Sequence, residues 1–201
     1  MIRESMFNTV AELLILRNFG VQDRLGKYPK IMEVIWKPPP YSWVKVNTDS
    51  SAYGTPGPSG CSGAFRIHRG FMRGCFSIPL GVGYAFEAEL ATTIHTIEFA
   101  WNYGWKHFWL ESDFSYVVSI LLARSLKFPI CWRPVWSRVL GLIANMSFTV
   151  THIYREGNYI ADLLISRAPS IVCPTWWWSA PSFISHVVYD DCIVKSSFRF
   201  C

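Results

Sequence analysis

Valine alternates with polar residues from Trp43 to Asp49, a pattern typical of a β-strand with one apolar face. A turn rich in glycine and proline follows at 52–60. Residues 61–68 and 71–79 then repeat the strand pattern. The three segments together predict an antiparallel three-stranded meander.

The spacing of apolar residues then changes to three or four, at Phe86, Leu90, Ile97 and Trp101. This spacing predicts a helix of about five turns that ends at Gly104. Beyond it, the pattern predicts a strand, two helices, a strand and a last helix, at 107–110, 117–124, 135–143, 148–154 and 158–167. Three strands followed by alternating helices and strands favour an α/β fold, a mixed sheet flanked by helices.

The chain is expected to have three parts. We predict an N-terminal helical appendage and linker at 1–35, a main domain at 36–169 and an aromatic C-terminal tail at 170–201. In the appendage, residues at helical spacing are Phe7, Val10, Leu13, Leu14 and Arg17. The proline run at 38–40 must be extended, and it marks the first boundary.

Three consecutive tryptophans, Trp176 to Trp178, characterise the tail. We favour a hydrophobic flap that covers apolar surface of the main domain. A base-stacking platform and a membrane anchor are the alternatives. Beyond Ser182 we expect poor order.

Composition places the protein among ordered globular chains. Of its 201 residues 51% are hydrophobic and 16% charged, which excludes wholesale disorder. The net charge of +5 is compatible with a polyanionic partner. No C-x-x-C pair, secretory leader or long apolar run is present, so we expect no structural zinc, no membrane partner and a cytosolic or nuclear monomer.

Four carboxylates fall near one edge of the predicted sheet. Asp49 ends the first strand, Asp113 follows the fourth, Glu89 is in the long helix and Asp162 is in the last helix. Carboxylates brought together repel one another unless cations neutralise them, and such hard ligands suit Mg²⁺ or Mn²⁺. Two ions could activate a water and stabilise the leaving oxygen at phosphorus. Taken singly, each acid could instead be a cap or a solvated surface residue.

The motifs around these acids occur in a characteristic order. They are Val46-Asn47-Thr48-Asp49-Ser50-Ser51, Ala88-Glu89-Leu90, Leu110-Glu111-Ser112-Asp113 and Arg155-Glu156-Gly157-Asn158-Tyr159-Ile160-Ala161-Asp162. The series resembles type 1 ribonuclease H, and in particular the plant group related to the reverse transcriptases of non-LTR retroelements. The resemblance covers about residues 36–168.

This resemblance implies a ribonuclease H-like fold, a five-stranded mixed sheet whose first three strands are antiparallel. It also implies hydrolysis of the RNA strand of RNA–DNA hybrids with Mg²⁺ or Mn²⁺, two ions being expected. Asp49, Glu89, Asp113 and Asp162 match the metal ligands of the family. Periodicity alone leaves Glu87 and Glu89 open as the helix ligand, and the acid-then-leucine motif favours Glu89.

Two positions depart from the family pattern. Ser50 stands where a glycine commonly follows the first aspartate, and serine could strain an unusual backbone angle there. The last loop lacks the histidine of many members and carries Arg155, which could contact the scissile phosphate. His152 lies nearby but belongs to the preceding strand, where a neutral packed or exposed residue is expected.

Candidate substrate contacts lie beside the acids and in a basic segment. They are Asn47, Ser50, Ser51, Arg155, Asn158 and Arg133. Arg124, Lys127, Arg133 and Arg138 interleave with Phe128, Trp132 and Trp136. That mixture suits a groove that follows a nucleic-acid backbone, or equally an amphipathic helix with packed tryptophans and solvated arginines.

Three functions therefore compete. The first is a metal-dependent endonuclease for RNA–DNA hybrids. The second is a non-catalytic nucleic-acid-binding module derived from a retroelement, motivated by Ser50 and the missing histidine. The third is an exonuclease, which would need a tyrosine or histidine near the last aspartate, such as Tyr159.

Overall fold

The computed structural model of the protein describes residues 10–20, 30–126, 130–167 and 173–200. The chain forms two compact units, one of residues 1–32 with 199–201 and one of Glu33–Phe198. Helix α1 (Val10–Asn18) belongs to the first unit, as the apolar spacing predicts. Residues 7–9 of the predicted helix lie outside the described part.

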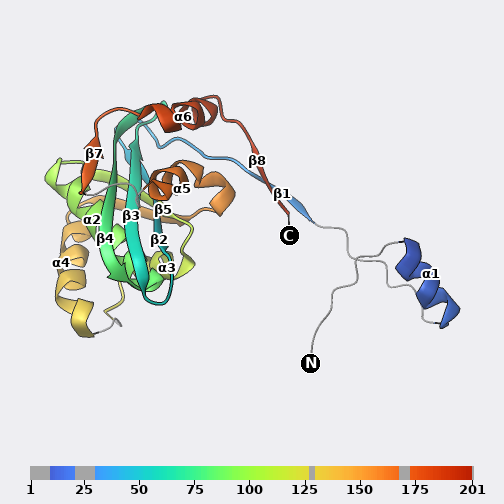
Figure 1. Cartoon of the computed structure of the whole chain (residues 1–201). Helices are drawn as coiled ribbons and strands as arrows, with labels where there is room; N and C mark the ends of the chain where they lie inside the picture. Colours follow the sequence, from blue (N-terminus) through green and yellow to red (C-terminus); the bar gives the residue numbers. More distant parts are fainter. Residues whose placement is uncertain (1–9, 21–29, 127–129, 168–172, 201) are drawn as a thin grey trace. The chain divides into compact units, whose positions relative to one another are not determined.

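A six-stranded sheet forms the centre of the larger unit, with the strand order β6-β5-β2-β3-β4-β7 (Figure 1). Its strands are β2 (Val44–Ala52), β3 (Gly57–Arg66), β4 (Met72–Gly83), β5 (His107–Ser112), β6 (Ser147–His152) and β7 (Thr175–Trp177). The first three are antiparallel, whereas β5 and β6 run parallel to β2. The predicted five-stranded mixed sheet is confirmed, and β7 adds a sixth strand at the edge.

The central position of β2 determines where the acids lie. In its antiparallel pairing with β3, Asp49 lies opposite Ser62, and in its parallel pairing with β5, Thr48 lies opposite Ser112. Parallel strands end at the same edge of a sheet. Asp49 and the residue after Ser112, which is Asp113, therefore meet at that edge.

Helices cover both faces of this sheet. On one face α2 (Ala85–Asn102), α3 (Ser115–Leu122) and α4 (Arg133–Ala144) enclose the main hydrophobic core. On the other, α5 (Tyr159–Ser166) and α6 (Ser185–Cys192) pack on a smaller cluster (Figure 1). The central strands are thus buried on both faces, so their polar side chains need hydrogen-bond partners within the protein.

The segment predicted as a tail takes part in the packing of the domain. Strand β7 pairs with β4, and the centroid of the Trp176 ring lies 5.2–6.4 Å from those of Phe65, Phe76 and Phe99. This geometry agrees with a hydrophobic flap. The expectation of poor order beyond Ser182 is wrong, because that stretch forms α6 and then β8 (Ser197–Phe200), which pairs with β1 (Ile31–Val34).

Among the described residues, no helix combines the length and the apolar character needed to cross a bilayer.

Candidate metal centre

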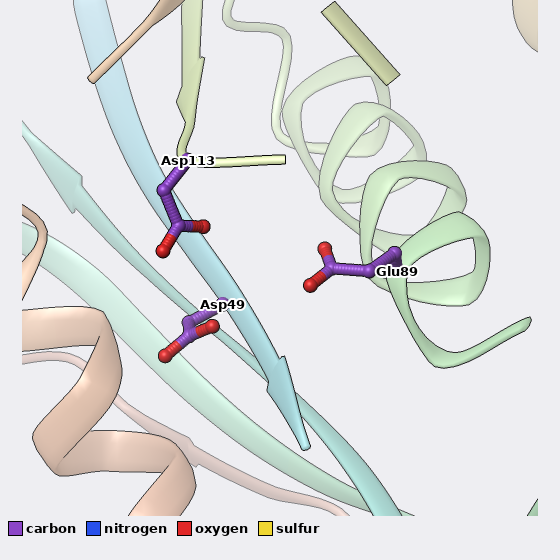
Figure 2. A group of neighbouring side chains, drawn as sticks. All are labelled: Asp49, Glu89 and Asp113. Atoms are coloured by element: carbon purple, nitrogen blue, oxygen red, sulfur yellow. The ribbon is translucent and has the colours of Figure 1, made fainter. Parts of the chain in front are cut away.

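Three carboxylates from three separate elements converge at the edge of the sheet. Asp49 comes from β2, Glu89 from the second turn of α2 and Asp113 from the residue after β5. One oxygen of each lies within 4.8 Å of the corresponding oxygens of the other two. Figure 2 shows the three side chains pointing toward one another. The structure therefore brings together three of the four predicted acids, although they are 40 and 24 residues apart in the chain.

The environment of this triad disfavours negative charge. Burial, followed by the neighbouring charges of Asp113 and Glu89, raises the pKa of Asp49 to about 8. Burial is also the main cause that raises the pKa of Glu89 to about 7, and it raises the pKa of Asp113. A nearby positive charge would favour the ionised form of all three groups.

Hydrogen bonds from Ser50 and His152 contact the residues of the triad. The Ser50 backbone N–H donates to Asp49 Oδ1 at 2.8 Å, and the Ser50 hydroxyl donates to Glu89 and so opposes the rise of its pKa. His152 Nε2 lies 3.1 Å from the Asp113 carbonyl oxygen, to which it must donate. Ser50 does not have a positive φ, so the strain considered for this position is absent.

The structure also separates Glu89 from Glu87. The Glu87 carboxylate accepts a hydrogen bond from the Tyr84 backbone N–H at 3.3 Å, which stabilises the start of α2. Glu89 instead belongs to the triad. The preference for Glu89 from the motif agrees with this placement.

Asp162 lies close to the triad but outside the 4.8 Å group. Its Oδ1 accepts a hydrogen bond from Arg155 at 2.6 Å. Its charge nevertheless acts on Asp49 and Asp113, raising the pKa of each. Asp162 therefore lies at the edge of the site, and its carboxylate is paired with Arg155.

Two predicted substrate contacts are buried instead. Asn47 is 0% exposed and Asn158 is 1% exposed. Asn158 donates to the Thr48 carbonyl at 2.8 Å and accepts from Asn47 at 3.2 Å, which ties the start of α5 to β2. The prediction that these side chains touch substrate is corrected, because their polar atoms are used within the fold.

Within the interleaved basic segment, residues 133–144 form the amphipathic helix α4, whereas Arg124 follows the end of α3. Trp136 is fully buried and donates to the Ser125 carbonyl, whereas Arg133 and Arg138 are exposed on α4. Arg138 forms an ion pair with Glu98. Lys127 and Phe128 lie outside the described residues.

A buried charged network next to the site was not predicted from the sequence. Lys45 pairs with Glu111 at 2.7 Å, and Arg66 pairs with Asp191 of α6. Arg66 also donates to Asn47 Oδ1 at 2.6 Å, and its guanidinium lies 3.5 Å from the centre of the Trp36 ring. The alternation of Lys45, Asn47 and Asp49 on one face of β2 was the available signal.

The donor set fits a divalent cation. Carboxylate oxygens are the ligands that Mg²⁺ and Mn²⁺ prefer, and the spacing of the triad is compatible with one ion shared among its members. The raised pKa values mean that negative charge on these groups is unfavourable in the protein alone. A bound cation would favour the ionised form of each group.

Comparisons with known proteins agree with the fold. A family model described as reverse transcriptase-like matches residues 47–168. An Arabidopsis thaliana protein named for ribonuclease H is 32% identical over 145 residues, which are 71% of this chain. The match covers 23% of that relative, so the chain spans less than a quarter of its length.

Solved structures show the same fold at lower identity. RNase H1 from the archaeon Halobacterium salinarum NRC-1 is 23% identical, covers 63% of this chain and 97% of that chain, and has a TM-score of 0.57. LC11-RNase H1 in complex with an RNA/DNA hybrid is 20% identical to this chain and has a TM-score of 0.55. The match covers 62% of this chain and 95% of that one. These similarities establish the ribonuclease H fold for the larger unit.

Proposed function

The chain belongs to the reverse transcriptase-like family and has a ribonuclease H fold, and we propose that it is a metal-dependent endonuclease that cuts the RNA strand of RNA–DNA hybrids. The observation that carries the proposal is the convergence of Asp49, Glu89 and Asp113 within 4.8 Å. The RNA/DNA hybrid bound by the structural neighbour LC11-RNase H1 supports this choice of substrate.

The proposed ligands of Mg²⁺ or Mn²⁺, in a two-ion site, are the triad and Asp162. The bound cations would supply charge stabilisation at phosphorus and a more acidic water. Asp49 and Glu89 would hold their positions through the hydrogen bonds from Ser50, while Asp113 is fixed through its backbone by His152. In this proposal the triad is already assembled, so binding requires little rearrangement of the protein.

Arg155 is the proposed contact to the scissile phosphate. Its side chain is 73% exposed, and its charge interacts with Asp162 and also with Asp49 and Asp113. A cation in this position favours an approaching phosphate. Ser50 and Ser51 follow Asp49 on β2, and they and the exposed Arg133 of α4 remain the proposed contacts to the RNA strand.

Cleavage of a labelled hybrid tests the proposal. Purified protein is incubated with Mg²⁺ and a hybrid whose RNA strand is labelled at its 5′ end, beside Asp49→Asn. We expect internal RNA fragments from the wild type and none from the variant. Equal products from both proteins, or no cleavage by either, would overturn the enzyme assignment.

The pattern of products separates the remaining functions. Mononucleotides alone would indicate an exonuclease. Hybrid binding without cleavage would indicate the non-catalytic module, which has less support because the carboxylate triad is intact.

A further inference from the structure

Two neighbouring hollows open at the end of the sheet that lies opposite the carboxylates. One has a volume of about 500 Å³ and the other about 430 Å³, and both are lined by Arg73 and Trp105. The first also includes the residues that precede or begin β2 and β5, Trp43 and His107. Asp49 is five residues along β2 from Val44, about 17 Å at the rise of a strand. We call the two hollows together the far-end groove.

The lining of the far-end groove carries positive charge and no negative charge. Arg73 and Lys106 are its cations, and His68 and His107 contribute imidazole groups. No aspartate or glutamate is present among the described residues that line either hollow. Arg73 is exposed and forms no ion pair with any other described residue. The charge of Arg73 is therefore available to an anionic ligand.

Aromatic rings surround the same groove and expose large surfaces. Tyr41 is 80% exposed, Trp178 is 62% exposed and Tyr103 is 40% exposed. The Tyr41 ring contacts His68 edge to face at 5.0 Å, and the Trp178 ring contacts Tyr103 in the same manner at 5.2 Å. Exposed rings at the rim of a hollow are typical of sites that bind another molecule.

We propose that the far-end groove binds single-stranded nucleic acid, with unpaired bases stacked on Tyr41 and Trp178 and the phosphate backbone facing Arg73. Aromatic rings combined with cations are the features by which proteins bind unpaired strands without sequence preference. A duplex fits less well because its base faces are covered by neighbouring base pairs. An acidic peptide would use the cations but would leave the exposed rings without a stacking partner.

This site is separate from the proposed hybrid nuclease. It needs no metal ion, and it lies at the other end of the strands that carry Asp49 and Asp113. A single-stranded extension of a nucleic-acid substrate, or a separate strand, could occupy it while the carboxylates act elsewhere. The two proposals can therefore fail independently.

Fluorescence anisotropy with a labelled oligonucleotide tests the inference. The full chain is titrated against a fluorescein-labelled 15-nucleotide uridine strand in EDTA, together with Tyr41→Ala, Trp178→Ala and Arg73→Ala. Each loss of a ring should raise Kd by at least about fivefold, and Arg73→Ala should lower the slope of log K against log salt by about 0.7. Circular dichroism and urea unfolding confirm that each exposed substitution leaves the fold intact.

Matched controls come from outside the groove. Tyr189→Ala removes a ring that is 65% exposed on α6, and Lys195→Ala removes an exposed cation, so both should bind as the wild type does. Asp49→Asn should keep full single-strand binding while it loses hybrid cleavage. The three groove variants should lose single-strand binding but still cleave a blunt-ended hybrid. Unchanged Kd values in all three groove variants would overturn the inference. So would equal competition by polyglutamate.

Discussion

Asp49 occupies the point at which the central strand, the long helix and the loop after β5 meet. Burial together with two neighbouring carboxylates raises its pKa to about 8, the value expected of a group that lacks a compensating charge. Such a group destabilises the metal-free protein when it ionises. The residue that the proposed chemistry needs most is thus also a source of pH-dependent instability.

The raised pKa of Asp49 makes the protein less stable as the pH rises. An acid whose pKa is higher in the folded than in the unfolded state holds its proton on folding, so stability falls as pH rises between the two values. For Asp49 this window runs from about 4 to about 8. In EDTA we expect Asp49→Asn to be more stable than the wild type at pH 8, by roughly 1–3 kcal/mol, with the difference vanishing near pH 4. Urea unfolding at both pH values measures this stability difference. A difference that grows toward low pH would contradict a raised pKa for Asp49.

Glu87 and Glu89 provide a matched pair of substitutions on one helix. Glu89→Gln should reduce hybrid cleavage by at least about 100-fold, since it removes a proposed metal ligand. Glu87→Gln removes only the charge of the acceptor that contacts the Tyr84 N–H and should leave cleavage within about twofold, at a stability cost of about 1 kcal/mol or less. Single-turnover cleavage assays compare the two. A larger loss in Glu87→Gln would reverse the assignment.

The order of motifs allowed the acids to be predicted, but not the surroundings of each side chain. Asn47 and Asn158 were predicted as substrate contacts, beside the acids of the site. They are buried instead, since β2 is covered by helices on both faces and its polar side chains must find partners inside the protein. A single sequence does not show which of two adjacent polar positions is covered.

At the scale of elements, the central strands and helices follow from periodicity, whereas β7 does not. Its three residues pair with an edge that β4 leaves open, and a run of three tryptophans carries no period. Helix α6 was missed for a related reason. It is held by Val187 and Val188, which pack in the smaller cluster, and by the ion pair between Asp191 and Arg66, a contact over 125 residues of sequence.

Removal of the Trp176 side chain tests the structural role of β7. The ring packs on Phe65, Phe76 and Phe99 in the main core, so Trp176→Ala should lower the free energy of unfolding by about 3–5 kcal/mol. Trp178→Ala, at a position that is 62% exposed, should lower it by less than about 1 kcal/mol. Urea unfolding of the two variants makes the comparison. A similar loss of unfolding free energy in both variants would show that the packing of Trp176 on the main core adds no particular stability.

Adjacent aspartates on α6 give an equally sharp test of the buried network. Asp191→Ala leaves the Arg66 charge buried without its partner and should cost about 3–5 kcal/mol. Asp190→Ala removes a pair with Lys195 at the surface and should cost at most about 1 kcal/mol. Thermal and urea unfolding report both values. Equal stability of the two variants would mean that leaving Arg66 without Asp191 costs no more than losing a surface ion pair.

For the whole molecule, the larger unit has two chemically distinct ends. The carboxylate triad lies at one end of β2 and β5, and the far-end groove with its rings and cations lies at the other. The chain spans 23% of the length of its Arabidopsis relative. The described residues thus carry a candidate site for metal and a candidate site for an unpaired strand.

Counting bound Mn²⁺ by electron paramagnetic resonance tests the central claim most directly. The wild type, Asp49→Asn and Glu87→Gln are titrated with Mn²⁺ at pH 8 without nucleic acid. We expect saturable Mn²⁺ binding by the wild type and Glu87→Gln, and binding at least about tenfold weaker for Asp49→Asn. If Asp49→Asn binds Mn²⁺ as tightly as the wild type, the ion is held elsewhere and the triad is not a metal centre.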